Sequence, residues 1–88
     1  MKTIEALNKC IELEEQGNNI LYFIMVNGTD ICNTLYEPLT GKQLLFLLDK
    51  DLLQCKCDLI EMKYLVGIAN ILYGVFCDKC FCLKIIME

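Results

Sequence analysis

The sequence predicts an α+β fold in which a small, mainly antiparallel sheet is covered by helices. Two observations predict this class. An Asn-Gly pair separates two runs rich in β-branched and aromatic residues, and stretches with helical spacing of apolar residues lie on either side of them. A chain of 88 residues is too short for two cores, so residues 1–88 are expected to form a single domain.

The first expected element is an amphipathic helix over Thr3–Gln16. Its apolar positions recur at helical spacing: Ile4, Leu7, Cys10 and Ile11. Gly17 follows at once and is expected to cap the carboxyl end, because glycine readily adopts the left-handed conformation that ends many helices.

A β-hairpin is expected next, with strands at Ile20–Val26 and Thr29–Tyr36. Asn27-Gly28 between them is typical of a type I′ turn, because both residues tolerate positive φ angles. The first strand is apolar on both faces, which predicts a central strand of the sheet. Pro38 is expected to end the second strand.

A second helix is expected to begin after Thr40, because Thr40 and Gln43 match the capping-box pattern. It is expected to run to Leu53 and to carry Leu44, Leu45, Leu48 and Leu52 along one side, while Phe46, Leu47 and Leu53 point elsewhere. A helix that is apolar nearly all round is expected to be buried or to meet a partner.

A third helix is expected to reach Phe76, because Asp58 and Glu61 match a second capping box. It would carry apolar residues on two opposite stripes, whereas a helix on a small sheet needs only one. The second stripe is therefore expected under the preceding helix or in an oligomer interface; its residues are Ile60, Tyr64, Ile68 and Ile71. Alternation over Phe81–Met87 predicts a C-terminal strand.

The residue types present exclude several kinds of active site. The chain has no His, Ser or Arg, so neither a Ser-His-Asp nor a Cys-His arrangement can be assembled within it. Its five glycines are scattered, which excludes a phosphate-binding loop and a dinucleotide fingerprint. The chain is therefore expected not to be an enzyme.

Charge and hydrophobicity indicate the kind of partner. A net charge of −4 without Arg disfavours nucleic acid, and the two uncharged stretches are too short to cross a membrane. The first ten residues do not resemble a secretory signal, so a cytoplasmic location is expected. Since 56% of the residues are hydrophobic, a homo-oligomer or a protein partner is expected to cover surplus apolar surface. Richness in Ile, Leu, Lys and Asn is typical of AT-rich genomes, which makes a phage or viral accessory inhibitor the specific hypothesis.

Seven cysteines leave three interpretations open: buried thiols, a metal site, and a minor redox role for Cys80 beside Lys79. The alternative to a pure binding module is a zinc-binding module, with Cys82 as a substitute ligand and these four ligands: Cys55, Cys57, Cys77 and Cys80. An unbroken helix over the intervening segment is the objection, because it would separate Cys57 from Cys77 by about 25 Å.

Overall fold

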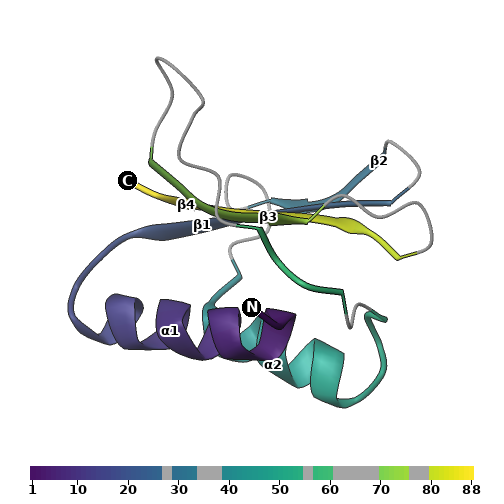
Figure 1. Ribbon diagram of the computed structural model, residues 1–88, viewed down its shortest axis with the longest axis horizontal. Helices are drawn as coiled ribbons and strands as arrows, with labels where there is room; N and C mark the ends of the chain where they lie inside the picture. The colour runs from purple at the N-terminus through teal and green to yellow at the C-terminus, as the bar shows by residue number, and fades with distance from the viewer. Residues whose placement is uncertain (27–28, 34–38, 55–56, 61–69, 76–79) are drawn as a thin grey trace.

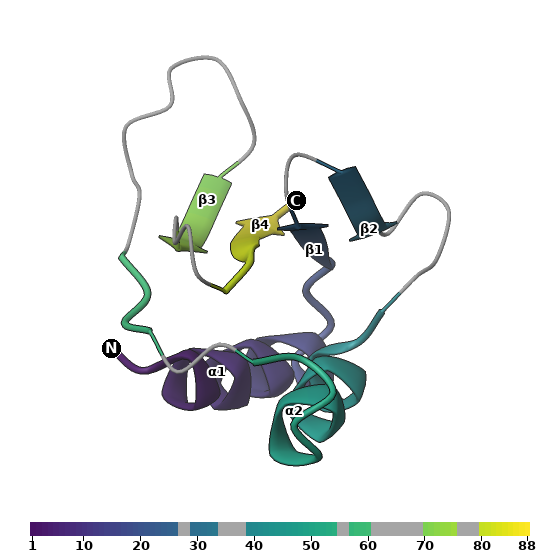
Figure 2. The same ribbon diagram turned by 90° about the vertical axis from the view of Figure 1, so that its right-hand side faces the viewer.

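The structure is a computed structural model that describes residues 1–26, 29–33, 39–54, 57–60, 70–75 and 80–88. Within these ranges, a layer of two helices covers one face of a four-stranded antiparallel sheet (Figures 1 and 2). The elements are, in order, α1 (Thr3–Glu15), β1 (Ile20–Val26), β2 (Thr29–Asn33), α2 (Gly41–Asp49), β3 (Asn70–Val75) and β4 (Cys82–Met87). The α+β class expected from the sequence is confirmed.

The last strand of the chain lies inside the sheet. The strand order is β2-β1-β4-β3, and every neighbouring pair is antiparallel. Ile85 of β4 lies opposite Tyr22 of β1 on one side and opposite Tyr73 of β3 on the other. The sheet is therefore completed only when the C-terminal strand inserts beside β1.

The core lies between the sheet and the helix layer. Alternate residues of β1 and β4 point toward the helices and are buried: Ile20, Tyr22, Ile24, Leu83 and Ile85. They meet the buried faces of the two helices, which consist of Ala6, Leu7 and Cys10 on α1 and Leu44 and Leu48 on α2. Each large side chain buried in this way contributes about 1.5–3 kcal/mol, so this layer supplies most of the stability.

The far face of the sheet also holds apolar residues. Ile86 lies opposite Ile71, each is only 6% exposed, and neither belongs to the core cluster beneath the helices. On the same face, Lys84 places its Nζ 5.8 Å from the centroid of the Phe23 ring. The alternation predicted for the C-terminal strand is confirmed, with Leu83 and Ile85 facing the helices.

The N-terminal helix matches the sequence prediction to within one residue. It ends at Glu15, and Gly17 adopts a φ of 94°. The Gly17 N–H donates to the Glu14 carbonyl (3.0 Å) and the Asn18 N–H donates to the Leu13 carbonyl (3.1 Å). These two bonds form a Schellman motif, which satisfies carbonyls that the helix end leaves open.

The pairing of the predicted hairpin is confirmed, since β1 and β2 are antiparallel and Val26 lies opposite Thr29. The register shifts between Ile24 and Met25. The turn residues Asn27-Gly28 and the end of the predicted second strand, residues 34–36, lie outside the described residues.

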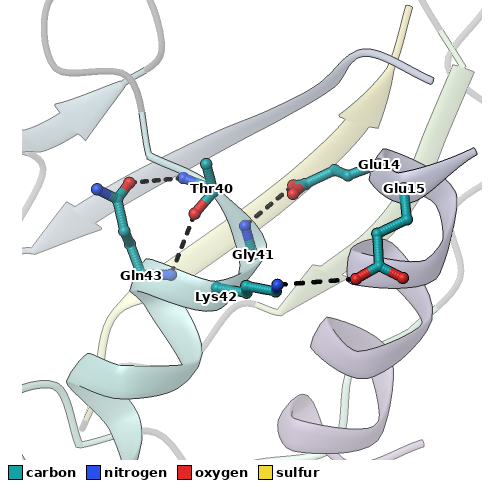
Figure 3. A network of polar contacts seen from close by, with 6 residues as sticks. All are labelled: Glu14, Glu15, Thr40, Gly41, Lys42 and Gln43. Atoms are coloured by element: carbon teal, nitrogen blue, oxygen red, sulfur yellow. Dashed lines mark hydrogen bonds and ion pairs between the residues drawn. The ribbon is translucent and has the colours of Figure 1, made fainter. Parts of the chain in front are cut away.

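Helix α2 begins as predicted and ends earlier. The Gln43 N–H donates to Thr40 Oγ1 (3.2 Å), and the Thr40 N–H donates to Gln43 Oε1 (2.8 Å), so the capping box is confirmed (Figure 3). The prediction that the helix reaches Leu53 is wrong. Asp51 adopts a φ of 54°, which takes the chain out of the helix, and Leu52 is left 65% exposed.

The prediction of a third helix as far as Phe76 is wrong over Asn70–Val75, which forms β3. The segment where this helix was expected to begin is also extended. Asp58 forms an isolated antiparallel β-bridge with Lys2, and Ile60 exchanges backbone hydrogen bonds with Gly74 (3.0 and 2.8 Å). A segment that is apolar on both faces satisfies the helical and the strand pattern equally, so pairing with β4 decides its structure. Residues 61–69 lie outside the described residues.

The assignment of β3 predicts specific proximities in solution. Because Tyr73 lies opposite Ile85 and Val75 opposite Leu83, NMR should show cross-strand contacts between these pairs and slow exchange of the paired amides. A helix over the same residues would instead give contacts between residues three apart and none to β4. That second pattern would contradict the strand.

Candidate functional site

The interface residues expected from the sequence do not share a helix. Ile60 is 66% exposed and forms the bridge to Gly74, whereas Ile71 is buried in β3. Tyr64 and Ile68, the other two residues of the predicted stripe, lie outside the described residues. The helical premise that grouped Ile60 with Ile71 is therefore wrong, because Ile71 lies in a strand, and an interface at these residues stays a prediction.

An exposed apolar surface lies instead on the helix layer. Phe46 of α2 is 57% exposed and Ile4 of α1 is 49% exposed. Two open depressions adjoin Phe46, with volumes of about 390 and 440 Å³, and Lys42 lines both. We call this the helix-layer surface; its residues are Ile4, Leu39, Lys42, Gln43, Leu45, Phe46, Leu47 and Asp49.

The helical period explains why Phe46 is exposed. Leu44 and Leu48 lie one turn apart on the buried side of α2, and Phe46 lies midway between them in sequence, so it projects from the opposite side. The Lys50 Nζ lies 5.9 Å from the centroid of the Phe46 ring, and Phe46 remains exposed beside it. The expectation that this helix is apolar beyond its buried face is met by Phe46.

A carboxylate joins α2 to the rest of the fold. Glu14 Oε1 accepts a hydrogen bond from the Gly41 N–H (2.9 Å) and another from the Tyr22 hydroxyl. Figure 3 shows Glu14 reaching from α1 to the first turn of α2, beside the weaker ion pair of Lys42 with Glu15 at 3.7 Å. An ionised acceptor at a helix N-terminus is favourable, because the N–H groups there lack helical partners.

Gly41 is required at this junction by close packing. A Cβ atom at Gly41 would lie 2.8 Å from Ile11 Cγ1 and 2.9 Å from the Tyr22 hydroxyl oxygen. Any other residue would force the side chain of Ile11 or Tyr22, or the helix itself, to shift. In the sequence, the feature that could have predicted this close packing is a glycine at the first helical position after the Thr40 cap.

Cys10 lies beside this carboxylate and is fully buried. Burial raises the pKa of the Cys10 thiol to about 12, with a further increase from the Glu14 charge and an opposing hydrogen bond from Tyr22. Burial and the bond to Glu14 also raise the pKa of Tyr22. Cys10 is therefore a protonated core thiol at neutral pH, as the buried-thiol interpretation expects.

Two of the four cysteines proposed as zinc ligands are brought together. Cys57 Sγ and Cys80 Sγ lie 3.6 Å apart, and both side chains are half-buried. Cys55 and Cys77 lie outside the described residues. Among the residues that the structure describes, no group of three potential metal ligands occurs, so the substitute ligand Cys82 does not join this pair.

Comparison with known proteins found no match: the chain matches no protein-family model, no curated protein and no solved structure. In the described part of the chain, no helix is long and apolar enough to span a membrane.

The double acceptor role of Glu14 predicts unequal effects at two adjacent positions. Glu14→Ala should lower the free energy of unfolding by about 2–3 kcal/mol, because it leaves the buried Tyr22 hydroxyl and the Gly41 N–H without their acceptor. Glu15→Ala removes only an exposed ion pair and should cost less than about 0.5 kcal/mol. Urea unfolding of both variants measures the difference, and equal losses would contradict this role.

The raised pKa of Cys10 predicts a loss of stability in alkali. Its ordinary value is 9.0 and its folded value is about 12, so the folded state holds a proton that the unfolded state releases between these values. This contribution is complete below pH 9.0 and falls as the pH rises toward 12. Urea unfolding at increasing pH should therefore show a steeper decline for the wild type than for Cys10→Ala, and parallel declines would contradict the assignment.

Proposed function

We propose that this chain is a non-enzymatic protein–protein interaction module, and that a second copy of the chain occupies its helix-layer surface. The observation that carries the proposal is the exposed Phe46, 57% accessible between two open depressions. Large exposed aromatic residues beside hollows are typical of interface anchors, because they bury much area with little loss of side-chain freedom. The absence of His, Ser and Arg from the sequence supports a binding role over catalysis.

The charges around Phe46 favour a second copy as the occupant. Lys42, Phe46 and Asp49 follow one another at helical spacing on one side of α2, and together they line one depression. Lys42 lies about 6 Å before Phe46 along the helix axis and Asp49 about 4.5 Å after it. A two-fold axis near Phe46 would set two α2 helices antiparallel, with Lys42 of each copy facing Asp49 of the other.

The size of the surface indicates a weak dimer. The nine residues of α2 span about 13 Å, whereas a stable interface buries about 800 Å² on each partner. Ile4 and Leu39 extend the contact beyond α2 without making it large. The dimer should therefore depend on concentration.

The wider role that we propose is that of a cytoplasmic accessory inhibitor of phage or viral origin, which acts by covering a partner protein. Its support is the composition of the chain, which is rich in Ile, Leu, Lys and Asn and lacks Arg. A weak dimer suits this role, because one surface can exchange a second copy for another protein of complementary shape.

Charge reversal tests the two-fold arrangement. Sedimentation equilibrium over a rising protein concentration should show a growing mass for the wild type and a constant monomer for Phe46→Lys. Lys42→Asp and Asp49→Lys should each weaken association, because each sets like charges opposite one another. The double variant Lys42→Asp/Asp49→Lys should restore it, because the opposite charges then face one another again.

Leu52→Lys is the matched control, since Leu52 is 65% exposed and lies outside the helix-layer surface. This variant should associate like the wild type. A wild type that remains monomeric throughout, or a double variant that is no better than the single ones, would overturn the second copy as the occupant. Urea unfolding of each variant separates lost association from lost folding.

A further inference from the structure

Two thiols from distant parts of the sequence lie side by side at the edge of the core. Cys57 and Cys80 are 23 residues apart, and their Sγ atoms are separated by 3.6 Å. Both side chains are half-buried and pack against the core cluster. The docking surface proposed above does not include either residue, so this pair needs an explanation of its own.

The topology removes the objection that the sequence raised against a shared site. The Ile60 N–H donates to the Gly74 carbonyl, and the Gly74 N–H donates back to the Ile60 carbonyl. The chain that leaves Cys57 by way of Ile60 has therefore returned beside Ile60 at Gly74. β4 then runs antiparallel to β3, with Leu83 opposite Val75.

The separation of the two sulfur atoms fits a pair of metal ligands. Four thiolates at about 2.3 Å from a tetrahedral Zn²⁺ lie about 3.8 Å from one another, close to the 3.6 Å observed. Cysteine clusters without disulfides are typical of zinc sites in reducing compartments. We propose that Cys57 and Cys80 are two ligands of a structural Zn²⁺ site.

The sequence supplies candidates for the remaining ligands. Cys55 precedes Cys57 by two residues and Cys77 precedes Cys80 by three, spacings at which one short segment can provide two ligands. Asp58 is engaged elsewhere: its carboxylate pairs with the Lys2 ammonium at 3.1 Å. Cys82 lies on β4 outside the core cluster.

Zinc at this pair would fasten the start of the chain to the start of β4. The Thr3 hydroxyl donates to the Cys57 carbonyl (2.9 Å), and the Leu59 N–H donates to the Met1 carbonyl (2.7 Å). Each thiol releases its proton to solvent when its sulfur binds the metal, so affinity rises with pH. The site would have a structural role, because it holds together segments that are distant in sequence.

Metal analysis tests the proposal. Protein produced with zinc in the medium and purified without chelator should contain about one equivalent of zinc. Cys57→Ser and Cys80→Ser should each lose it, whereas the matched control Cys82→Ser should keep it. A wild type with reduced thiols and less than about half an equivalent of zinc would overturn the proposal, as would equal zinc loss in Cys82→Ser and Cys80→Ser.

Cobalt keeps the test decisive if the serine variants fail to fold. Adding Co²⁺ to reduced, metal-free wild-type protein should give the thiolate-to-cobalt charge-transfer absorption of a tetrahedral sulfur site, and Zn²⁺ should abolish it. Absence of that absorption would overturn the site. Peptide mapping that recovers Cys57 and Cys80 as a disulfide in protein purified under reducing conditions would also overturn it.

Discussion

The Glu14 carboxylate is the contact on which the arrangement of the helix layer depends. One oxygen receives hydrogen bonds from α2, through the Gly41 N–H, and from β1, through the Tyr22 hydroxyl, while Glu14 itself belongs to α1. Bonds to an ionised acceptor are roughly twice as strong as neutral ones. The missing Cβ of Gly41 allows this approach, so charge and close packing together fix where α2 starts.

The orientation of Phe46 follows from that junction. Once Thr40 caps α2 and Gly41 packs against α1, the helical period turns Leu44 and Leu48 into the core and Phe46 away from it. The helix ends at Asp49, which limits how much apolar surface it can present. The exposed ring is thus a consequence of how the helix is anchored.

Much of the fold could be predicted from the sequence, because local chemistry specified it. The Gly17 cap, the Thr40 capping box and the alternation before Met87 each describe one element and needed no distant partner. β3 could not be predicted in this way. Its residues are apolar on both faces, and only pairing with β4 distinguishes a strand from a helix there.

The incorrect prediction of a helix over Asn70–Val75 had two consequences for the predicted sites. It placed Ile60 and Ile71 on a common stripe, and it set Cys57 far from Cys77. The backbone bonds between Ile60 and Gly74 and the strand β3 remove the common helix that both inferences assumed, and they bring the chain at Gly74 back beside Ile60. Hydrophobic periodicity indicates which sides of a segment are buried. The approach of Cys57 to Cys80 depends instead on where the intervening segment returns in space, and only long-range strand pairing determines that position.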